Sequence, residues 1–553
     1  MKPRPITHVT PKSARRKDLW WRGAVIYQIY PRSFADANGD GIGDLPGITA
    51  HLDYVAKLGV DAIWISPFMK SPMRDYGYDV ADYKDVDPIF GTLADFDALL
   101  AQAHSLGLKV LVDFVPSHTS DEHPWFQESR QDRTNPRADW YVWADPKPDG
   151  TPPNNWLAMF GGSAWEWEPR RSQYYLHNFL KEQPDLNFHN PEVVAALLDQ
   201  AKFWLERGVD GFRLDAIDFG AHDPQLRNNP ARRPRATVGG AAPGSPVAMQ
   251  LQRWNKALPE LVELFLKPLH ALTERYRGKM LLGEISGDDA LLRAAQYTTG
   301  GGLDIAYTFH LLSCAPLASE VRAVVEHLER VLDDGWACWS LSNHDVRRAV
   351  TRFGGPSASN GLRTLLPIVL TSLRGTICLY QGEELGLEEA DLALSDLKDP
   401  FGIAFWPTFK GRDGCRTPMP WRHDIPHGGF SSGKPWLPVP GSHLERAVDL
   451  QEQQESSTLS RVREFLHWRK RQPALVTGDI SFERTQDPVL SFVRTEGKQS
   501  LHCIFNFGDE AVTKRTRASA VDAGCPVGDF ELRGRTVTLP PHGIAFLRLE
   551  DHG

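Results

Sequence analysis

The sequence has few cysteines and none of the spacings that mark a zinc site or a redox pair. It contains no CxxC pair and no Cys/His set at metal-ligand spacing. We therefore expect free, mostly buried thiols. The six cysteines are scattered as Cys314, Cys338, Cys378, Cys415, Cys503 and Cys525.

Long apolar runs and an excess of positive charge are also missing. No segment approaches the roughly 20 uninterrupted apolar residues that cross a bilayer. The opening MKPRPITHVTPKSARRKDLWW is basic and proline-rich but lacks the apolar stretch of a secretory signal. The formal net charge is -8 and the two signs are mixed, which leaves no basic stripe for nucleic acid. We expect a cytoplasmic monomer or homodimer with no nucleic-acid or membrane partner.

Apolar, strand-like runs alternate with amphipathic helical stretches along most of the chain. Eight such units predict an α/β fold, a (β/α)8 TIM barrel, rather than an open sheet. The eight runs are Ala24–Phe34, Ala62–Phe68, Lys109–His118, Gly211–Ile217, Met280–Ser286, Ile305–Leu311, Ala337–Asp345 and Thr376–Glu384.

Two stretches do not fit the repeating units and predict further domains. About ninety residues separate the third and fourth runs, far more than a usual barrel loop. After residue 475 come short alternating strands separated by Gly, Asp and Pro turns. We predict a flexible arm (1–17), a barrel (18–118 and 191–475), an inserted subdomain B (119–190) and a C-terminal antiparallel β-sandwich (476–553). A Pro/Gly/Arg-rich loop (227–246) is predicted after the fourth strand.

Polar residues gather where the predicted barrel strands end. Catalytic groups of such barrels sit at this C-terminal face, and a charge in a strand buried on both faces is costly unless it is paired or functional. Converging carboxylates, histidines and an arginine indicate a site rather than isolated ion pairs. The residues are Asp113, Ser117, His118, Arg213, Asp215, Glu284, Asn343, His344 and Asp345.

Two facing carboxyl groups are what cleavage of a glycosidic bond requires. Arg213 lies two residues before Asp215, hence on the same side of the strand, and is expected to keep that carboxyl ionised. Glu284 has no cation adjacent in sequence and is the better candidate for a raised pKa and the protonated role. The residues alone thus predict a paired-carboxylate hydrolase and leave its stereochemistry open.

Nine motifs follow one another from Trp20 onward: YQIYPRSF, DANGDGIGDL, DYGYDVADY, DFVPSHTSDEH, QPDLN, GFRLDAID, GEIS, SNHD and GRDGCRTPMPW. In these motifs and in their order the chain resembles the α-amylase family of glycoside hydrolases (family 13), in its α-glucosidase and oligo-1,6-glucosidase branch. The resemblance implies that Asp215 is the nucleophile, Glu284 the acid/base and Asp345 the carboxylate that holds the 2- and 3-hydroxyls. It also implies net retention of the α anomer.

The same resemblance assigns residues that would hold a single terminal glucose. His118, Arg213 and His344 match hydrogen-bonding residues, and Tyr78 matches the platform under the ring. Asp75 and Arg416 match a pair that closes the pocket, which implies exo action. Phe160 and Phe179 match aromatics at the entrance, and Gln183 matches a residue near the pocket.

The segment DANGDGIGD has the oxygen-ligand spacing of a calcium loop but lacks the final Glu of an EF-hand, because Gly47 stands there. By resemblance, a structural Ca2+ or Mg2+ is expected here, and no cofactor for catalysis. A turn closed by Asx side chains without metal is the alternative. The implied ligands are Asp36, Asn38, Asp40, the carbonyl of Ile42, and Asp44.

Ala216 follows the predicted nucleophile, where relatives that prefer α-1,6 bonds usually carry Val. The smaller side chain favours α-1,4 cleavage of short substrates, and the branch that the chain resembles suggests glucosyl transfer to small alcohols or phenols. An oligo-1,6-glucosidase and a sucrose- or maltose-isomerising glucosyltransferase are the alternatives among enzymes. A catalytically inactive sugar-binding or transporter-associated protein is the alternative of another class.

Overall fold

The computed structural model describes residues 19–232, 252, 255–287, 289–332, 335–516 and 520–549. Its centre is a parallel sheet whose strands run in the order β11-β10-β9-β5-β2-β1-β13-β12. A parallel bridge between Ala306 and Ala337 joins the two edges, so the sheet closes as the predicted barrel. The strands are β1 (Val25–Ile29), β2 (Ala62–Ile65), β5 (Lys109–Phe114), β9 (Gly211–Leu214), β10 (Met280–Ile285), β11 (Ile305–Thr308), β12 (Cys338–Trp339) and β13 (Thr376–Tyr380).

Burial on both faces explains why these strands are almost wholly apolar. Every residue of β1, β9, β10 and β13 is buried, as expected where helices cover a parallel sheet. Apart from Thr376, which begins β13, the polar exceptions Gln28, Arg213 and Glu284 fall near the carboxyl ends of their strands. They therefore face the end of the barrel where loops begin.

Helices surround the barrel and show the boundary signals that the sequence contains. A capping box between Thr92 and Asp95 begins α3, and Gly59 and Gly208 end α2 and α5 in the left-handed conformation. The surrounding helices are α2 (Leu52–Leu58), α3 (Leu93–Ser105), α5 (Pro191–Arg207), α7 (Lys267–Thr273), α8 (Ala290–Thr298), α10 (Ala318–Val331), α12 (Asn360–Ser372) and α16 (Thr458–Arg469).

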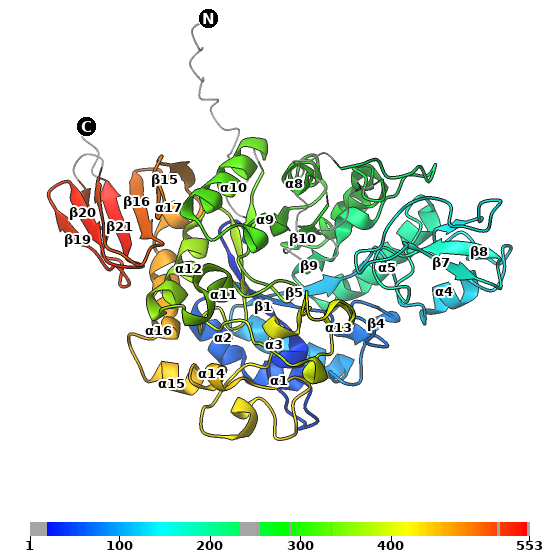
Figure 1. The fold of residues 1–553 in the computed structure, drawn as a ribbon, viewed down its shortest axis with the longest axis horizontal. Coiled ribbons are helices and arrows are strands. Elements are labelled where there is room, and N and C mark those ends of the chain that lie inside the picture. Colours follow the sequence, from blue (N-terminus) through cyan, green and yellow to red (C-terminus); the bar gives the residue numbers. More distant parts are fainter. Residues whose placement is uncertain are drawn as a thin grey trace, which may run out of the picture.

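Between β5 and α5 the chain leaves the barrel and builds a separate unit. It forms α4 (Pro124–Ser129) and a small antiparallel sheet of β6 (Trp143–Ala144), β8 (Gln173–Leu176) and β7 (Trp165–Glu168). Figure 1 shows this unit, in cyan, at one end of the molecule.

After α16 the chain forms two antiparallel sheets at the opposite end of the molecule (Figure 1). One has the order β14-β15-β16-β21-β18 and the other β17-β20-β19. Apolar residues from both, including Ile504, Val537 and Leu547, form one core, as in a sandwich. The strands are β14 (Asp479–Phe482), β15 (Val489–Glu496), β16 (Gln499–Asn506), β17 (Val512–Arg515), β18 (Ala520–Asp522), β19 (Glu531–Arg533), β20 (Thr536–Leu539) and β21 (Ile544–Leu549).

The sandwich rests on the outer helices of the barrel. The ring of Phe546 in β21 packs at a tilt against Phe465 and Trp468 of α16, at ring-centre distances of 5.3 and 5.2 Å. Among the described helices, none combines the length and apolarity needed to cross a membrane. The predicted arm and most of the Pro/Gly/Arg-rich loop lie outside the described residues.

Candidate active site

A pocket of about 120 Å3 opens at the carboxyl ends of the barrel strands. That volume is well below the roughly 300–1,000 Å3 of clefts that enclose drug-sized ligands, so it suits one sugar ring rather than a chain. Nine of the residues predicted from the sequence line this pocket. They are Asp75, Tyr78, His118, Phe160, Phe179, Gln183, Asp215, Glu284 and Asp345.

One buried arginine lies beneath the pocket and connects the carboxylates. Arg213 is 0 % exposed, and its Nη1 donates to Asp215 (2.6 Å) and to Asp113 (3.0 Å). Its Nη2 forms an ion pair with Glu284 and donates to Tyr307 (2.8 Å). Tyr307 in turn donates to Glu284 (2.7 Å). Asp215 and Glu284 are therefore held on adjacent nitrogens of a single guanidinium.

Spacing along the sequence assigns a neighbouring cation to Asp215 but not to Glu284, and the structure corrects this prediction. Glu284 does contact a cation, because Arg213 reaches it across neighbouring strands. Burial is the largest influence on Asp215 and raises its pKa to about 7; Arg213 opposes the shift, while the charges of Asp113 and Asp345 add to it. The prediction that Arg213 keeps Asp215 ionised is wrong as stated, since burial outweighs that contact near neutral pH.

We expect Asp113→Asn to move the acidic limb of the kcat/KM profile to lower pH. If Asp215 must be ionised to react, activity falls as the pH drops through its pKa. Removing the Asp113 charge lowers that pKa, by on the order of one unit for a buried neighbour, and asparagine retains the shape. The measurement is kcat/KM against pH for an aryl α-glucoside, the substrate class that the sequence resemblance implies, with exposed Asp199→Asn as control. An acidic limb that stays in place or moves upward would contradict this account.

The pKa of Asp345 is shifted in the opposite direction from that of Asp215. Burial would raise its pKa, but neighbouring charges outweigh burial and hold the pKa well below the ordinary value. Arg412 and Arg416 both donate to its Oδ1, at 3.2 and 3.0 Å. The adjacent His344 is uncharged at neutral pH because burial lowers its pKa to about 3, so the arginines supply the stabilising charge. Asp345 is thus a permanent anion in the pocket wall.

The predicted pairing of Asp75 with Arg416 is wrong. Arg412 donates to Asp75 (2.7 Å) and to Asp399 (2.9 Å) and lines the pocket. Arg416 is 0 % exposed and donates to the carbonyl of His344 (2.7 Å). The two arginines flank η6 (Asp413–Cys415), a single turn of 3-10 helix, and only the first of them reaches Asp75.

Two buried histidines contact Tyr78 in the pocket, one through its ring and the other through its backbone carbonyl. Tyr78 stacks on His344 (5.3 Å between ring centres, 6° between planes) and hydrogen-bonds its Nε2. His118 Nε2 lies 3.0 Å from the carbonyl of Tyr78 and 3.1 Å from Gln183. Burial lowers the pKa of His118 to about 4. Both histidines are therefore neutral hydrogen-bonding groups at pH 7.

Aromatic side chains from separate loops form the rim of the pocket. Phe160 packs on Phe179 (6.0 Å) and on Phe401 (4.9 Å), and Phe179 packs on Phe219 (5.4 Å). Phe160 and Phe179 come from the inserted unit, whereas Phe401 belongs to α13 (Pro400–Phe405). The rim presents apolar faces to whatever occupies the entrance.

Several pocket residues were not assigned a binding role from the sequence. The sequence does contain an indication for Arg412, because the motif GRDGCR has two arginines four residues apart and either could have been the pocket residue. The others have small or apolar side chains that a core position would equally explain. Besides Arg412 they are Met159, Ala216, Ser286, Phe309 and Phe401.

The predicted metal loop follows β1 and is closed by its own side chains. Asp36 accepts hydrogen bonds from the backbone of Asn38, Gly39 and Gly41 and from the hydroxyl of Ser431. Further along the loop, Asn38 accepts from the backbone of Asp40 (2.9 Å), which itself accepts from Ile42 (2.8 Å).

Asp44 caps α1 (Leu45–Ala50) through the backbone of Gly47 (2.6 Å). In the described part of the chain, the one set of three carboxylate, imidazole or thiolate groups within 4.8 Å is elsewhere, at His423, Asp424 and Asp449. The loop oxygens remain of the type that Ca2+ and Mg2+ prefer.

The pocket brings together paired carboxyl groups of the kind that cleavage of a glycosidic bond requires, and comparison with known proteins identifies the family. The family model "Alpha amylase, catalytic domain" matches residues 28–478. A probable α-glucosidase of Rhizobium meliloti (strain 1021) is 54 % identical over 96 % of this chain and 97 % of its own. An oligo-1,6-glucosidase of Parageobacillus thermoglucosidasius is 36 % identical over 89 % and 91 %.

Solved structures give the same result. The α-glucosyl transfer enzyme XgtA has a TM-score of 0.93 and 55 % identity, covering 96 % of this chain and 99 % of that one. The trehalulose synthase MutB from Pseudomonas mesoacidophila MX-45 has a TM-score of 0.85 and 31 % identity, covering 96 % and 99 %. The chain belongs to the α-amylase family of glycoside hydrolases.

Proposed function

We propose that the protein is a retaining, exo-acting α-glucosidase that releases glucose from the non-reducing end of short α-glucosides. Asp215 attacks the anomeric carbon and forms a β-linked glucosyl-enzyme, while Glu284 protonates the departing oxygen. Glu284 then removes a proton from the incoming water or alcohol. Asp345 holds the 2- and 3-hydroxyls through the transition state.

The single observation that carries this proposal is the shared guanidinium of Arg213. Carboxylates that contact adjacent nitrogens of one guanidinium stay close together. Retaining glycosidases place their two carboxyls about 5–5.5 Å apart, whereas inverting enzymes leave room for an intervening water. The proximity of Asp215 and Glu284 therefore favours the retaining route.

The closed end of the pocket supports exo action. The wall at this end consists of Tyr78 and the ion pair of Asp75 with Arg412. Arg412 donates hydrogen bonds to the carboxylates of both Asp75 and Asp399. Arg412 holds Asp75 in place, and carboxylate oxygens are acceptors for the hydroxyl groups of a sugar. The terminal sugar would be gripped there, and the remainder of the substrate would leave past the aromatic rim.

Initial rates on maltose, isomaltose and maltotetraose test the linkage and length preference. We expect maltose to be cleaved fastest, because Ala216 leaves space beside the nucleophile and the small pocket gives little contact to a third sugar. The first product is expected to be α-glucose, observed by NMR before mutarotation. Faster cleavage of isomaltose would reject the α-1,4 assignment, and β-glucose as first product would reject retention.

Transfer to an acceptor uses the same intermediate. Water and alcohols compete for the glucosyl-enzyme, and the apolar rim favours acceptors with an aromatic or alkyl part. The relatives that carry transferase names support this second outcome. An isomerising transferase is the alternative among enzymes, and it would convert sucrose or maltose to isomers rather than to free glucose.

We also propose that the loop of Asp36, Asn38, Asp40, Ile42 and Asp44 holds a structural Ca2+ or Mg2+. The expected result of chelation with EDTA is a melting temperature several degrees lower, reversed by adding the ion back, because an ion that binds only the folded state stabilises it. Asp40→Asn, which removes one exposed carboxylate, should reduce the EDTA effect. A melting temperature that EDTA leaves unchanged would favour the metal-free turn.

A further inference from the structure

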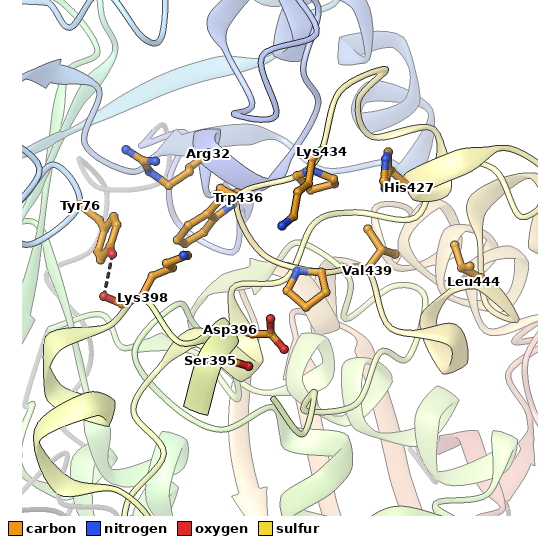
Figure 2. A pocket seen from close by; sticks show the side chains of 12 residues that line it. Arg32, Tyr76, Ser395, Asp396, Lys398, His427, Lys434, Trp436, Val439 and Leu444 are labelled. Carbon is orange, nitrogen blue, oxygen red and sulfur yellow. Dashed lines mark hydrogen bonds between the residues drawn. The ribbon is translucent and has the colours of Figure 1, made fainter. Parts of the chain in front are cut away.

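A second cavity, of about 610 Å3, has Tyr76 in its lining, the residue next in sequence to Asp75 of the catalytic pocket. Figure 2 shows its lining, in which Trp436 and Tyr76 stand near Lys398 and Lys434. Asp75 and Asp399 are the two carboxylates that hold Arg412. Tyr76 directly follows Asp75 in the sequence, and Lys398 directly precedes Asp399. The hydroxyl of Tyr76 donates to the carbonyl of Lys398 (2.7 Å) and joins these two segments. The cavities thus share a wall but have different linings.

The cavity contains a buried arginine that forms no ion pair with a described residue, although the charge of the nearby carboxylate of Asp87 favours its charged form without contacting it. Arg32 is only 6 % exposed, and its Nε has no hydrogen-bond partner. Within the described ranges the structure gives its guanidinium no hydrogen bond and no ion pair. It lies instead among three aromatic rings, 5.2 Å from Tyr76, 5.2 Å from Trp436 and 5.7 Å from Phe90. Burying such a charge is costly unless an anion compensates it.

The rings that hold Arg32 are themselves fixed. The indole nitrogen of Trp436 donates to the hydroxyl of Ser33 (3.0 Å), and its backbone nitrogen donates to the carbonyl of Gly41 (2.9 Å). Tyr76 is fixed by its bond to Lys398. Arg32 is therefore presented in one orientation, which reduces the entropy that a ligand must overcome on binding.

Further positive charge surrounds the cavity. Lys398 and Lys434 are exposed and line it, and neither has an ion pair among the residues that the structure covers. Asp396 is the one carboxylate of the lining. Arg32, Lys398 and Lys434 against this one carboxylate leave a local excess of positive charge in a chain of net charge -8, and such an excess attracts anions.

We propose that this cavity is a second ligand site, which binds a small organic anion through a phosphate or carboxylate group. Arg32 anchors the anion, since a planar guanidinium matches both groups bidentately. Lys398 and Lys434 add charge at the mouth. The open faces of Trp436 and Tyr76 cover the organic part of the ligand.

Isothermal titration calorimetry on the full chain tests the site, with inorganic phosphate, phenyl phosphate and benzoate at constant ionic strength. We expect saturable binding, with phenyl phosphate tighter than inorganic phosphate because the aromatic walls add contact. Comparison of phenyl phosphate with benzoate shows which anionic group the site prefers. The heat should persist when glucose is present in excess, because glucose occupies the catalytic pocket.

Variants of the lining residues test whether the probes bind in this cavity. Lys398→Ala with Lys434→Ala is expected to weaken binding about tenfold, as the loss of two partly screened charges predicts. Arg32→Lys keeps the charge but not the planar donors and should weaken binding further. The matched control replaces two exposed lysines away from the cavity, Lys147→Ala with Lys498→Ala, and should bind as the wild type does.

Melting curves establish that each variant is folded. The absence of saturable binding of all three probes to the wild-type protein would overturn the proposal. So would a double lysine variant that binds as tightly as its control, or binding that glucose abolishes.

Discussion

Asp215→Asn is expected to lower kcat on p-nitrophenyl α-glucoside by on the order of 10^4-fold or more, as loss of a nucleophile does in other covalent mechanisms. The amide has nearly the same shape but cannot attack the anomeric carbon. It retains an oxygen that can accept the hydrogen bond from Arg213, so the buried network stays largely satisfied. The melting temperature should therefore change little while turnover is lost.

Exposed Asp199→Asn is the matched control, because it makes the same chemical change on the surface in an ion pair with Lys84. It should leave kcat unchanged. An Asp215→Asn protein that retains wild-type turnover would refute the nucleophile assignment. Turnover lost together with the folded state would instead assign Asp215 a structural role.

Glu284→Gln is expected to slow cleavage to a different extent for different substrates, depending on how readily the leaving group departs without a proton. General acid catalysis contributes roughly 10^2–10^4-fold, and this contribution is needed most when a sugar alkoxide departs. Cleavage of maltose should fall by about that factor. Formation of the glucosyl-enzyme from p-nitrophenyl α-glucoside should fall much less, because p-nitrophenolate leaves without a proton.

Pre-steady-state measurement with the aryl substrate checks this expectation. A burst of p-nitrophenolate followed by slow turnover is expected, since the second step also needs Glu284 as base. Equal losses on maltose and in the burst phase would contradict the acid/base role and would indicate that Glu284 only binds the sugar or Arg213.

Most of the architecture could be predicted because local sequence and global fold agree. Strands buried on both faces are continuous apolar runs, and the polar residue at the end of each run then has to face the loops. Asp215, Glu284 and Asp345 meet in space for that reason. The alternation of side chains along a strand also predicts the contact of Arg213 with Asp215, which the structure contains.

The sequence-based predictions that are wrong concern contacts between neighbouring strands and between loops. Arg213 reaches Glu284 from a neighbouring strand, a proximity that spacing along one strand does not contain. Asp75 and Arg412 are brought together by two long loops, and the turn between Arg412 and Arg416 decides which arginine enters the pocket. Phe309, directly after β11, and Phe401, in α13, have apolar side chains, and the sequence does not distinguish a place at the pocket from a place in the core.

The C-terminal sandwich contacts α16 through Phe546 and lies at the opposite end of the molecule from the inserted unit that supplies Phe160 and Phe179 to the pocket mouth (Figure 1). A solid support or a fused partner protein attached beyond β21 would therefore face away from the entrance. Substrate and product would diffuse freely even at a crowded surface. Immobilisation through that end should preserve catalytic efficiency, whereas coupling through the inserted unit should obstruct it.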